Sequence, residues 1–230
     1  MKRVLLALVI IGCMSTARAQ NAVDVNLTAD FVSSTVWRGL YLSRAALQSD
    51  LTVGWKGLKF SVWGCAVLTD PLCEIDLTLS YTIGGLRLSV VDYWDNSEEA
   101  RYFYYKPRGT GHSFEGSIEY DFGPVKASWQ TFFAGRDYQE ADDKRAFSSY
   151  VEILVPFRLG GLDWNARAGV VPWASDYYET KSFSLKFVSL KATKSIHITE
   201  KFVLPLYGEL IATPSSRKLY FVAGFTIKAF

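Results

Sequence analysis

The chain has 230 residues, of which 49% are hydrophobic, 15% aromatic and 21% charged. This composition excludes a disordered or collagen-like chain. The 3 Cys and 2 His residues leave little material for a zinc framework or a metal cluster. The formal net charge of +2 is too small to indicate a nucleic-acid-binding surface. We therefore expect a folded protein of one or at most two domains, without a metal, a cofactor or a nucleic-acid partner.

Residues 1–19 have the layout of a secretory signal peptide. A basic start and an apolar run over residues 4–12 precede small residues at Ala17 and Ala19, which suit cleavage after Ala19. The apolar run is too short to span a bilayer, which needs about 20 residues. An alternative is a lipoprotein signal, because residues 10–13 (Ile-Ile-Gly-Cys) resemble a lipobox. The fit of the cleavage site favours the ordinary signal peptide.

Residues 20–230 then form the mature domain. Cleavage removes three basic residues and no acidic ones from the 25 basic and 23 acidic residues of the whole sequence, so the mature chain carries a net charge of −1. No segment of this domain reaches about 18 consecutive apolar residues, the length that indicates a transmembrane helix. If the domain enters a membrane, it must do so as a closed β-barrel.

Apolar and polar residues alternate with a period of two along the whole mature domain, and this pattern predicts strands. The clearest example is the segment 74–83, in which every odd position is apolar and every even position is polar. A strand sorts such residues onto two faces, whereas a helix would spread them around its circumference. The pattern predicts about twelve strands, over residues 24–34, 46–55, 58–67, 74–83, 86–94, 113–122, 125–134, 146–157, 162–172, 183–192, 196–210 and 218–230.

The connections between these strands alternate in length. Short turns are expected near residues 55–57, 84–85, 123–124, 160–161 and 193–195. The longer connections are expected at 35–45, 68–73, 95–112, 135–145, 173–182 and 211–217. Short turns at one end and longer loops at the other are the layout of an outer-membrane barrel.

A soluble sandwich or a lipocalin-like barrel would explain the alternation equally well. It explains less well why the apolar faces are so aromatic, with Trp55, Tyr81, Trp129 and Trp164 on them, several near strand ends where a membrane interface would lie. We therefore predict an all-β fold, a transmembrane antiparallel up-and-down β-barrel in the bacterial outer membrane, surrounded by outer-membrane lipid. A strand that ends in Phe230 is the usual signal for the barrel-assembly machinery, although the alternation places this residue off the outward face.

Four short motifs carry a resemblance to a known family. They are Leu27-Thr28-Ala29-Asp30-Phe31, Trp37-Arg38-Gly39 and Ala46-Leu47-Gln48, followed by Glu74-Ile75-Asp76-Leu77 with Tyr81. Over the first part of the chain, to about residue 95, the sequence resembles the TorF-like porin family of exported bacterial barrels. The opening pattern of that family is a strand, an aromatic-Arg-Gly element and a short polar segment that leads into the second strand. The resemblance implies a pore.

If the apolar faces point toward lipid, the polar faces line the interior. The principal candidates for lining the lumen are Asp30, Arg38, Glu74, Asp76, Arg87, Glu115, Glu119, Glu152, Arg167 and Lys186. The same face assignment adds Asp50, Lys59, Asp121, Lys126, Arg158 and Asp163. Such a mixture of charges fits a narrow aqueous path, or equally a hydrogen-bonded plug. About twelve strands lie between filled barrels of about eight strands and open porins of about sixteen.

Two loop features keep several interpretations each. Arg38 follows the first strand and could form a constriction or meet an anionic solute, or it could simply anchor its loop. The segment 95–112, with the run Tyr102-Phe103-Tyr104-Tyr105, could be a recognition surface or fold inward to narrow the pore. It could equally extend the strands above the membrane with an aromatic girdle.

Cys65 and Cys73 flank a short loop, and an oxidising periplasm would allow a disulfide between them. The alternation places Cys65 on a polar face and Cys73 on an apolar face, and opposite faces oppose a bridge unless the strand ends are irregular. We keep the disulfide as a possible feature.

The function that we expect is passive diffusion of small polar solutes, without a reaction. One alternative is a structural or adhesive barrel with a plugged lumen. Another is a lipid-modifying outer-membrane enzyme, which would need a Ser-His pair oriented by a third polar group. His112 and Ser113 are adjacent on a predicted strand and point to opposite faces, and His197 lies by a predicted turn, so neither histidine suits that role.

Overall fold

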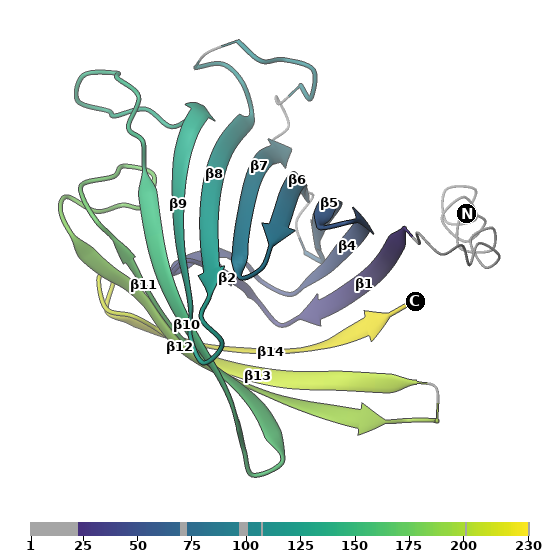
Figure 1. Cartoon of the computed structure of the whole chain (residues 1–230). Helices are drawn as coiled ribbons and strands as arrows, with labels where there is room; N and C mark the ends of the chain where they lie inside the picture. The colour runs from purple at the N-terminus through teal and green to yellow at the C-terminus, as the bar shows by residue number, and fades with distance from the viewer. Residues whose placement is uncertain (1–22, 70–72, 97–100, 107, 201, 230) are drawn as a thin grey trace.

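A computed structural model of the chain describes residues 23–69, 73–96, 101–106, 108–200 and 202–229. Its strands form a closed barrel in which each strand runs antiparallel to its neighbours, and β14 returns to pair with β1 (Figure 1). The barrel strands are β1 (Asp24–Val32), β4 (Ala46–Trp55), β5 (Leu58–Val67), β6 (Cys73–Ile83), β7 (Leu86–Asn96), β8 (His112–Asp121), β9 (Lys126–Gly135), β10 (Ser149–Leu159), β11 (Leu162–Val171), β12 (Ser184–His197), β13 (Val203–Thr213) and β14 (Lys218–Lys228). The predicted all-β, up-and-down barrel of twelve strands is therefore confirmed. The predicted signal peptide and Phe230 lie outside the described residues.

The alternation that predicted the strands also sorts the side chains between the two faces of the wall. On β6, Leu79 and Ile83 are 52% and 62% exposed, whereas Asp76 and Ser80 are only 9% and 2% exposed. Exposed apolar side chains therefore point outward from the barrel, and buried polar ones point into it. This arrangement is the reverse of a soluble protein, in which apolar residues fill the interior.

The outer surface is an almost continuous apolar band with aromatic residues toward both ends. Exposed aromatic side chains near the short turns belong to Trp55, Tyr81, Tyr120, Phe122 and Phe157. Those near the longer connections belong to Phe133, Phe147, Trp173, Phe183 and Phe221. Among the described residues, no helix has the length and apolar character needed to cross a membrane.

One predicted turn is wrong. Residues 193–195 (Thr-Lys-Ser) were expected to form a turn, but β12 continues through them to His197 and pairs there with β13. The strand ends after His197, and Ile198 N donates to the carbonyl of Phe202 at 2.9 Å, just before β13 begins. Thr193 and Ser195 are polar because they share the inner face with Ser189, which is buried, whereas Lys194 lies on the outer face and donates from Nζ to the carbonyl of Gly161 at 3.4 Å. In a barrel with a polar interior, polar residues at a strand end do not mark a turn.

The connection between β1 and β4 contains a hairpin that the alternation did not predict. It consists of β2 (Thr35–Trp37) and β3 (Leu40–Ser43), which pair with each other and not with the barrel wall. Arg38 and Gly39 form the turn, with φ angles of 49° and 82°. Two consecutive positive φ angles are typical of the tight type I′ hairpin, which favours glycine at its second central position.

Candidate functional site

The hairpin β2–β3 reaches across the interior of the barrel at the end that carries the longer connections. Gln48 of β4 donates a hydrogen bond from Nε2 to Oγ1 of Thr35 at 3.0 Å. The ring of Trp37 meets the ring of Tyr93 on β7, with 5.7 Å between centroids. Val36 packs against a buried cluster from three further strands, formed by Phe187, Ile211 and Val222. Because these partners come from around the wall, the hairpin lies across the lumen.

Arg38 fixes the tip of the hairpin to the wall. Its Nη1 and Nη2 atoms lie 2.5 and 2.9 Å from the two carboxylate oxygens of Glu115 on β8, a bidentate ion pair. The guanidinium carbon Cζ lies over the rings of Trp37 and Tyr150, at 4.3 and 4.9 Å from their centroids. The side chains of Arg38 and Glu115 are 11% and 2% exposed. A bidentate pair whose guanidinium also contacts aromatic rings is the geometry that arginine, rather than lysine, provides.

The connection 172–183 packs onto the hairpin from another side. Tyr178 is fully buried, and its hydroxyl oxygen accepts a hydrogen bond from Nη1 of Arg38 at 2.6 Å. Lys186 of β12 donates from Nζ to the backbone carbonyl of Tyr178 at 2.6 Å, which holds this connection inside the barrel. Burial is the main cause that raises the pKa of the Tyr178 phenol, so the phenol remains neutral beside Arg38.

An aromatic cluster fills the same half of the lumen. Phe132, Tyr150, Val171 and Tyr178 are its buried members. The partly buried side chains of Trp37, Leu40, Tyr93 and Tyr177 pack against them. The rings of Phe132 and Tyr177 lie 4.4 Å apart between centroids. These contacts join the hairpin, the connection 172–183 and the strands β7, β9, β10 and β11 into one packed layer.

A second charged group lies beside this layer on β10, β11 and β13. Arg167 lies 2.6 Å from Oε1 of Glu209 and 3.8 Å from Oε1 of Glu152, measured from Nη2 and Nη1 respectively. The hydroxyl of Tyr150 donates to Oε2 of Glu152 at 3.0 Å. Because the Tyr150 ring also contacts Arg38, the two charged groups form one chain of alternating charges across the lumen.

The structure thus brings together five of the predicted lumen residues, Arg38, Glu115, Glu152, Arg167 and Lys186, in or beside one layer. Of the remaining five, Asp76 also borders the layer, because it lies opposite Tyr93 in the register of β6 and β7. Asp30 accepts a hydrogen bond from Thr226 of β14, and Asp76 is almost buried on β6. Glu74 and Glu119 are half-buried, on β6 and β8. Arg87 lies near the short turns, far along the strand from the hairpin.

Several members of the layer were not predicted from the sequence. Trp37 and Gly39 were noted only within the aromatic-Arg-Gly motif, and Glu209 was not assigned a role. The tandem tyrosines at 177 and 178 in a long connection could have signalled an inward fold, because two adjacent aromatic residues are unusual in a solvated loop. The remaining aromatic members are indistinguishable from ordinary strand residues.

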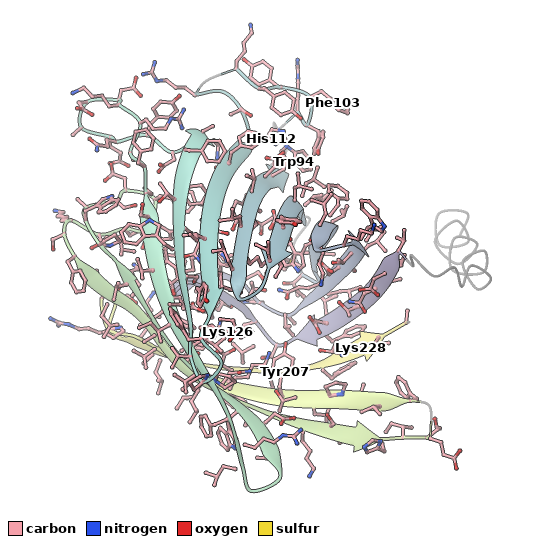
Figure 2. The ribbon with its side chains drawn as sticks, in the orientation of Figure 1. Trp94, Phe103, His112, Lys126, Tyr207 and Lys228 are labelled. Atoms are coloured by element: carbon pink, nitrogen blue, oxygen red, sulfur yellow. The ribbon has the colours of Figure 1, made fainter. Side chains whose placement is uncertain are left out.

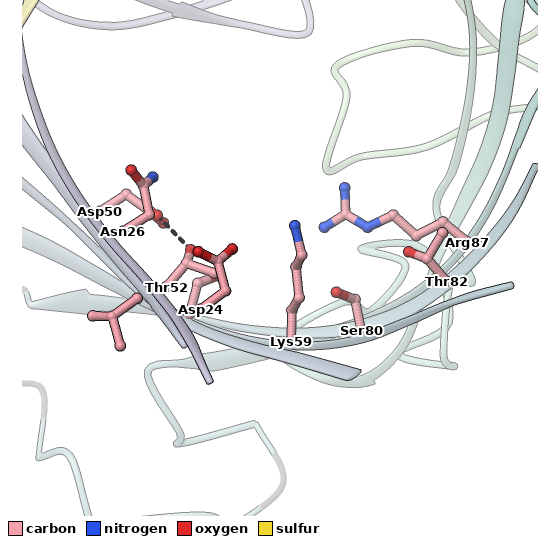
Figure 3. A pocket seen from close by; sticks show the side chains of 10 residues that line it. Asp24, Asn26, Asp50, Thr52, Lys59, Ser80, Thr82 and Arg87 are labelled. Atoms are coloured by element: carbon pink, nitrogen blue, oxygen red, sulfur yellow. Dashed lines mark hydrogen bonds between the residues drawn. The ribbon is translucent and has the colours of Figure 1, made fainter. Parts of the chain in front are cut away.

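A cavity of about 650 Å³ occupies the opposite half of the lumen, near the short turns (Figure 3). Its lining is polar and mixed in charge. It consists of Asp24, Val25, Asn26, Asp50, Thr52, Lys59, Ser61, Ser80, Thr82 and Arg87, which come from β1, β4, β5, β6 and β7. The interior therefore has two parts, a packed layer at one end and an open polar chamber at the other.

The segment that carries the Tyr-Phe-Tyr-Tyr run packs on the outer face of the wall. Trp94 and His112 face each other across β7 and β8, on the face that also exposes Leu88 and Val90. Figure 2 shows both residues below the connection that carries Phe103. The Tyr102 ring meets Trp94 with 5.2 Å between centroids. The described part of this segment, residues 101–106 and 108–111, thus covers the wall from outside.

The environment of His112 does not match a hydrolase. Its Nδ1 lies 2.7 Å from Oδ1 of Asp92, and its Nε2 lies 2.6 Å from the backbone carbonyl of Tyr102. Both ring nitrogens are therefore occupied by acceptors. Ser113 is buried on the inner face, on the other side of the wall from His112. A nucleophilic serine must lie within hydrogen-bonding reach of its histidine, and this one does not.

The predicted disulfide stays a prediction. Cys65 is buried on β5 opposite Glu74, and Cys73 of β6 lies opposite Ala66 in the register. The two cysteines are therefore one residue out of register across neighbouring strands. The side chain of Cys73 lies outside the described residues.

No protein-family profile matches the sequence, and no curated protein matches it. Several solved structures are similar in shape. A porin named NanC has 10% identity and a TM-score of 0.43, and the match covers 89% of this chain and 98% of that one. An outer-membrane channel from Pseudomonas putida F1 has 10% identity and a TM-score of 0.41, covering 93% and 99%. An outer-membrane phospholipase from Salmonella typhi has 11% identity and a TM-score of 0.42, covering 96% and 98%.

Proposed function

We propose that the chain is a barrel of the bacterial outer membrane that acts as a passive channel for small polar solutes. The observation that carries this proposal is the inverted distribution of side chains around a closed barrel. The outer face exposes apolar residues from every strand, and most of the charged strand residues lie on the inner face. An exposed apolar band flanked by two aromatic girdles fits a bilayer, and a polar interior fits an aqueous path.

The connections orient the barrel in this proposal. In outer-membrane barrels the short turns face the periplasm and the longer loops face outward. The open chamber would then lie on the periplasmic side, and the layer built around the hairpin β2–β3 would lie toward the outside. Outer-membrane lipid surrounds the barrel, and the barrel-assembly machinery inserts it. The predicted signal peptide over residues 1–19 would direct its export.

The hairpin sets the aperture of this channel. Its tip is fixed by a buried ion pair, and its flanks pack on several strands, so it behaves as part of the wall rather than as a mobile loop. Only small solutes would pass beside it. We propose no reaction, because the geometry around His112 and Ser113 lacks a nucleophile in contact with its base.

A second candidate is a barrel whose lumen is closed by the same hairpin and whose outer loops bind a partner. The observation that favours it is the dense packing of the layer, in which Phe132, Tyr150 and Tyr178 are at most 1% exposed. Small barrels tend to fill their interiors with side chains. The two candidates differ in one physical property, which is ion flow through the barrel.

Electrical recording in a planar bilayer tests the proposal. The folded protein is added to the bilayer, and insertion is verified separately by flotation with lipid vesicles and by protection from protease. The channel predicts discrete and reproducible current steps, whose size and ion preference change when Arg87 is replaced by Gln. An inserted protein that gives no steps would support the closed barrel.

A further inference from the structure

The open chamber near the short turns separates its charges by sign. Asp24 of β1 and Asp50 of β4 supply carboxylates on one side. Lys59 of β5 and Arg87 of β7 supply cations on the other. Figure 3 shows the Lys59 and Arg87 side chains extending into the open space, with Asp24 and Asp50 on the neighbouring wall. Because β1, β4, β5, β6 and β7 are consecutive in the barrel, the sign of the charge changes once along this arc.

The register gives the spacing of these groups. Asp24 pairs with Gly54 of β4, and Gly54 pairs with Lys59 of β5, so the acid and the base are two strands apart. Neighbouring strands are about 4.8 Å apart, which places the two backbones about 10 Å from each other. Gly54 has no side chain between them, and a Cβ at that position would contact Lys59 Cγ at 3.4 Å and Asp24 Cβ at 3.7 Å.

The two cations of the chamber, Lys59 and Arg87, are not paired with side chains of the described part of the protein. Within the part of the chain that the structure describes, no hydrogen bond or ion pair joins Lys59 or Arg87 to another side chain. Glu119 lies opposite Arg87 in the register without forming such a pair. In the charged layer at the other end, by contrast, Arg38 and Arg167 are both paired with carboxylates.

On the cationic side of the chamber, the buried hydroxyl of Ser80 also indicates a ligand site. Ser80 lines the chamber next to Lys59 in the register and is 2% exposed. Its hydroxyl has no hydrogen-bond partner among the described residues. A buried hydroxyl without a partner costs free energy, and a ligand oxygen between Lys59, Ser80 and Arg87 would remove that cost.

We propose that this chamber recognises small zwitterions, which carry one ammonium group and one carboxylate a few bonds apart. The carboxylate lies toward Lys59, Ser80 and Arg87, and the ammonium group lies toward Asp24 and Asp50, with Asn26 as a further acceptor. A solute with only one charge would gain attraction on one side and meet like charge on the other. The inference rests on the proposed function, since it names the class of solute that the channel would accept.

The test measures binding to the folded protein in detergent micelles, with 4-aminobutyrate as the probe. Butyrate and butylammonium are matched controls that carry only one of its two charges. Each exposed ion pair changes affinity only a few-fold in water, so the two charges on one side together give about a fivefold effect. We expect the dissociation constant of 4-aminobutyrate to be at least about fivefold below those of both controls.

Paired substitutions then assign the two sides. Lys59→Gln with Arg87→Gln should weaken 4-aminobutyrate and butyrate about fivefold and leave butylammonium unchanged or tighter. Asp24→Asn with Asp50→Asn should weaken 4-aminobutyrate and butylammonium instead. Lys194→Gln is the matched control, because Lys194 is an exposed cation on β12 that is not part of the lining. It should change none of the three affinities.

The inference is overturned if 4-aminobutyrate binds no tighter than both singly charged probes, a comparison that needs only the native protein. It is also overturned if folded variants of both kinds bind it as the native protein does. Electrical recording in a planar bilayer tests the proposed channel independently of this binding result. Zwitterion binding without conductance would refute the channel and keep the recognition site. Conductance without preferential binding of 4-aminobutyrate would support the channel and refute the recognition site.

Discussion

At the residue scale, Arg38 is the group on which the interior depends most. Its ion pair with Glu115 is almost fully buried, and Tyr93 donates a further hydrogen bond to Oε1 of Glu115 at 3.1 Å. Removing one partner of a buried pair leaves the other charge without compensation. Sequence reasoning proposed a constriction, an anionic solute or a loop anchor for Arg38, and the geometry supports the anchor and, through it, the constriction.

Arg38→Gln should therefore lower the free energy of unfolding by about 3 kcal/mol. Glu115→Gln should cost about as much, and the double variant should cost clearly less than the sum, because the two groups act on each other. Denaturant unfolding in lipid vesicles, followed by tryptophan fluorescence, measures these values. Arg158→Gln is the matched control, since Arg158 also pairs with an acid but its side chain is 85% exposed. Equal losses at both sites would contradict the account.

His112 anchors the outer connection in a comparable way. It is fully buried, and its two nitrogens contact Asp92 and the carbonyl of Tyr102. His112→Phe should keep the ring but lose both contacts, so residues 101–111 should exchange their amide hydrogens faster. Hydrogen exchange followed by mass spectrometry measures this. The matched control is His197→Phe, an exposed site at the end of β12. Unchanged exchange in the His112 variant would show that the aromatic contacts alone hold the connection.

At the scale of elements, the hairpin β2–β3 decides how the lumen is filled. Gly39 is the point of closest approach, because a Cβ at this position would lie 2.4 Å from the carbonyl oxygen of Lys186. Gly39→Ala should therefore push the tip of the hairpin away from the wall. Gly123→Ala is a matched control, since Gly123 also has a positive φ, of 92°, but a Cβ there would meet nothing within 4 Å.

We expect Gly39→Ala to raise the susceptibility of residues 33–45 to limited proteolysis several-fold, and Gly123→Ala to leave it unchanged. Both substitutions place a side chain at positive φ, so backbone strain alone would raise the proteolysis of each variant at its own turn, and the cleavage of the turn around Gly123 is therefore measured as well. A result in which the two variants behave identically would show that the contact with Lys186 does not hold the hairpin.

The strands could be predicted from the sequence because each one carries its own pattern. In segment 74–83 the polarity of each residue indicates which face of the strand it occupies. No contact with a distant segment is therefore needed to predict this strand. The hairpin could not be predicted in this way, since its position depends on contacts of Trp37 and Arg38 with residues far along the chain. Its local signal was Arg38-Gly39 between two short runs of β-formers. The prediction of a turn at residues 193–195 was wrong because the inner face of a barrel tolerates polar residues at the ends of strands.

At the scale of the whole molecule, the account requires the apolar band to face lipid. Val90 lies in the middle of β7 and is 46% exposed on the outer face. An arginine on the lipid face near the midplane costs about 2–4 kcal/mol. Val90→Arg should therefore lower the free energy of unfolding of the protein in lipid vesicles by about that amount. Ser61→Arg, which adds the same group to the chamber, should cost less than half as much. Comparable costs at both sites would argue against a lipid-facing band.

The central claim is that solutes pass through the barrel beside a hairpin that narrows it. The most direct test is the single-channel conductance of two proteins side by side. One is native, and in the other residues 35–43 are replaced by a short Gly-Ser segment that cannot reach the far wall. We expect discrete steps from the native protein and steps at least about twice as large from the variant, because the layer around Trp37 and Arg38 is gone. The absence of current steps from both proteins after verified insertion would refute this expectation, and so would steps of equal size.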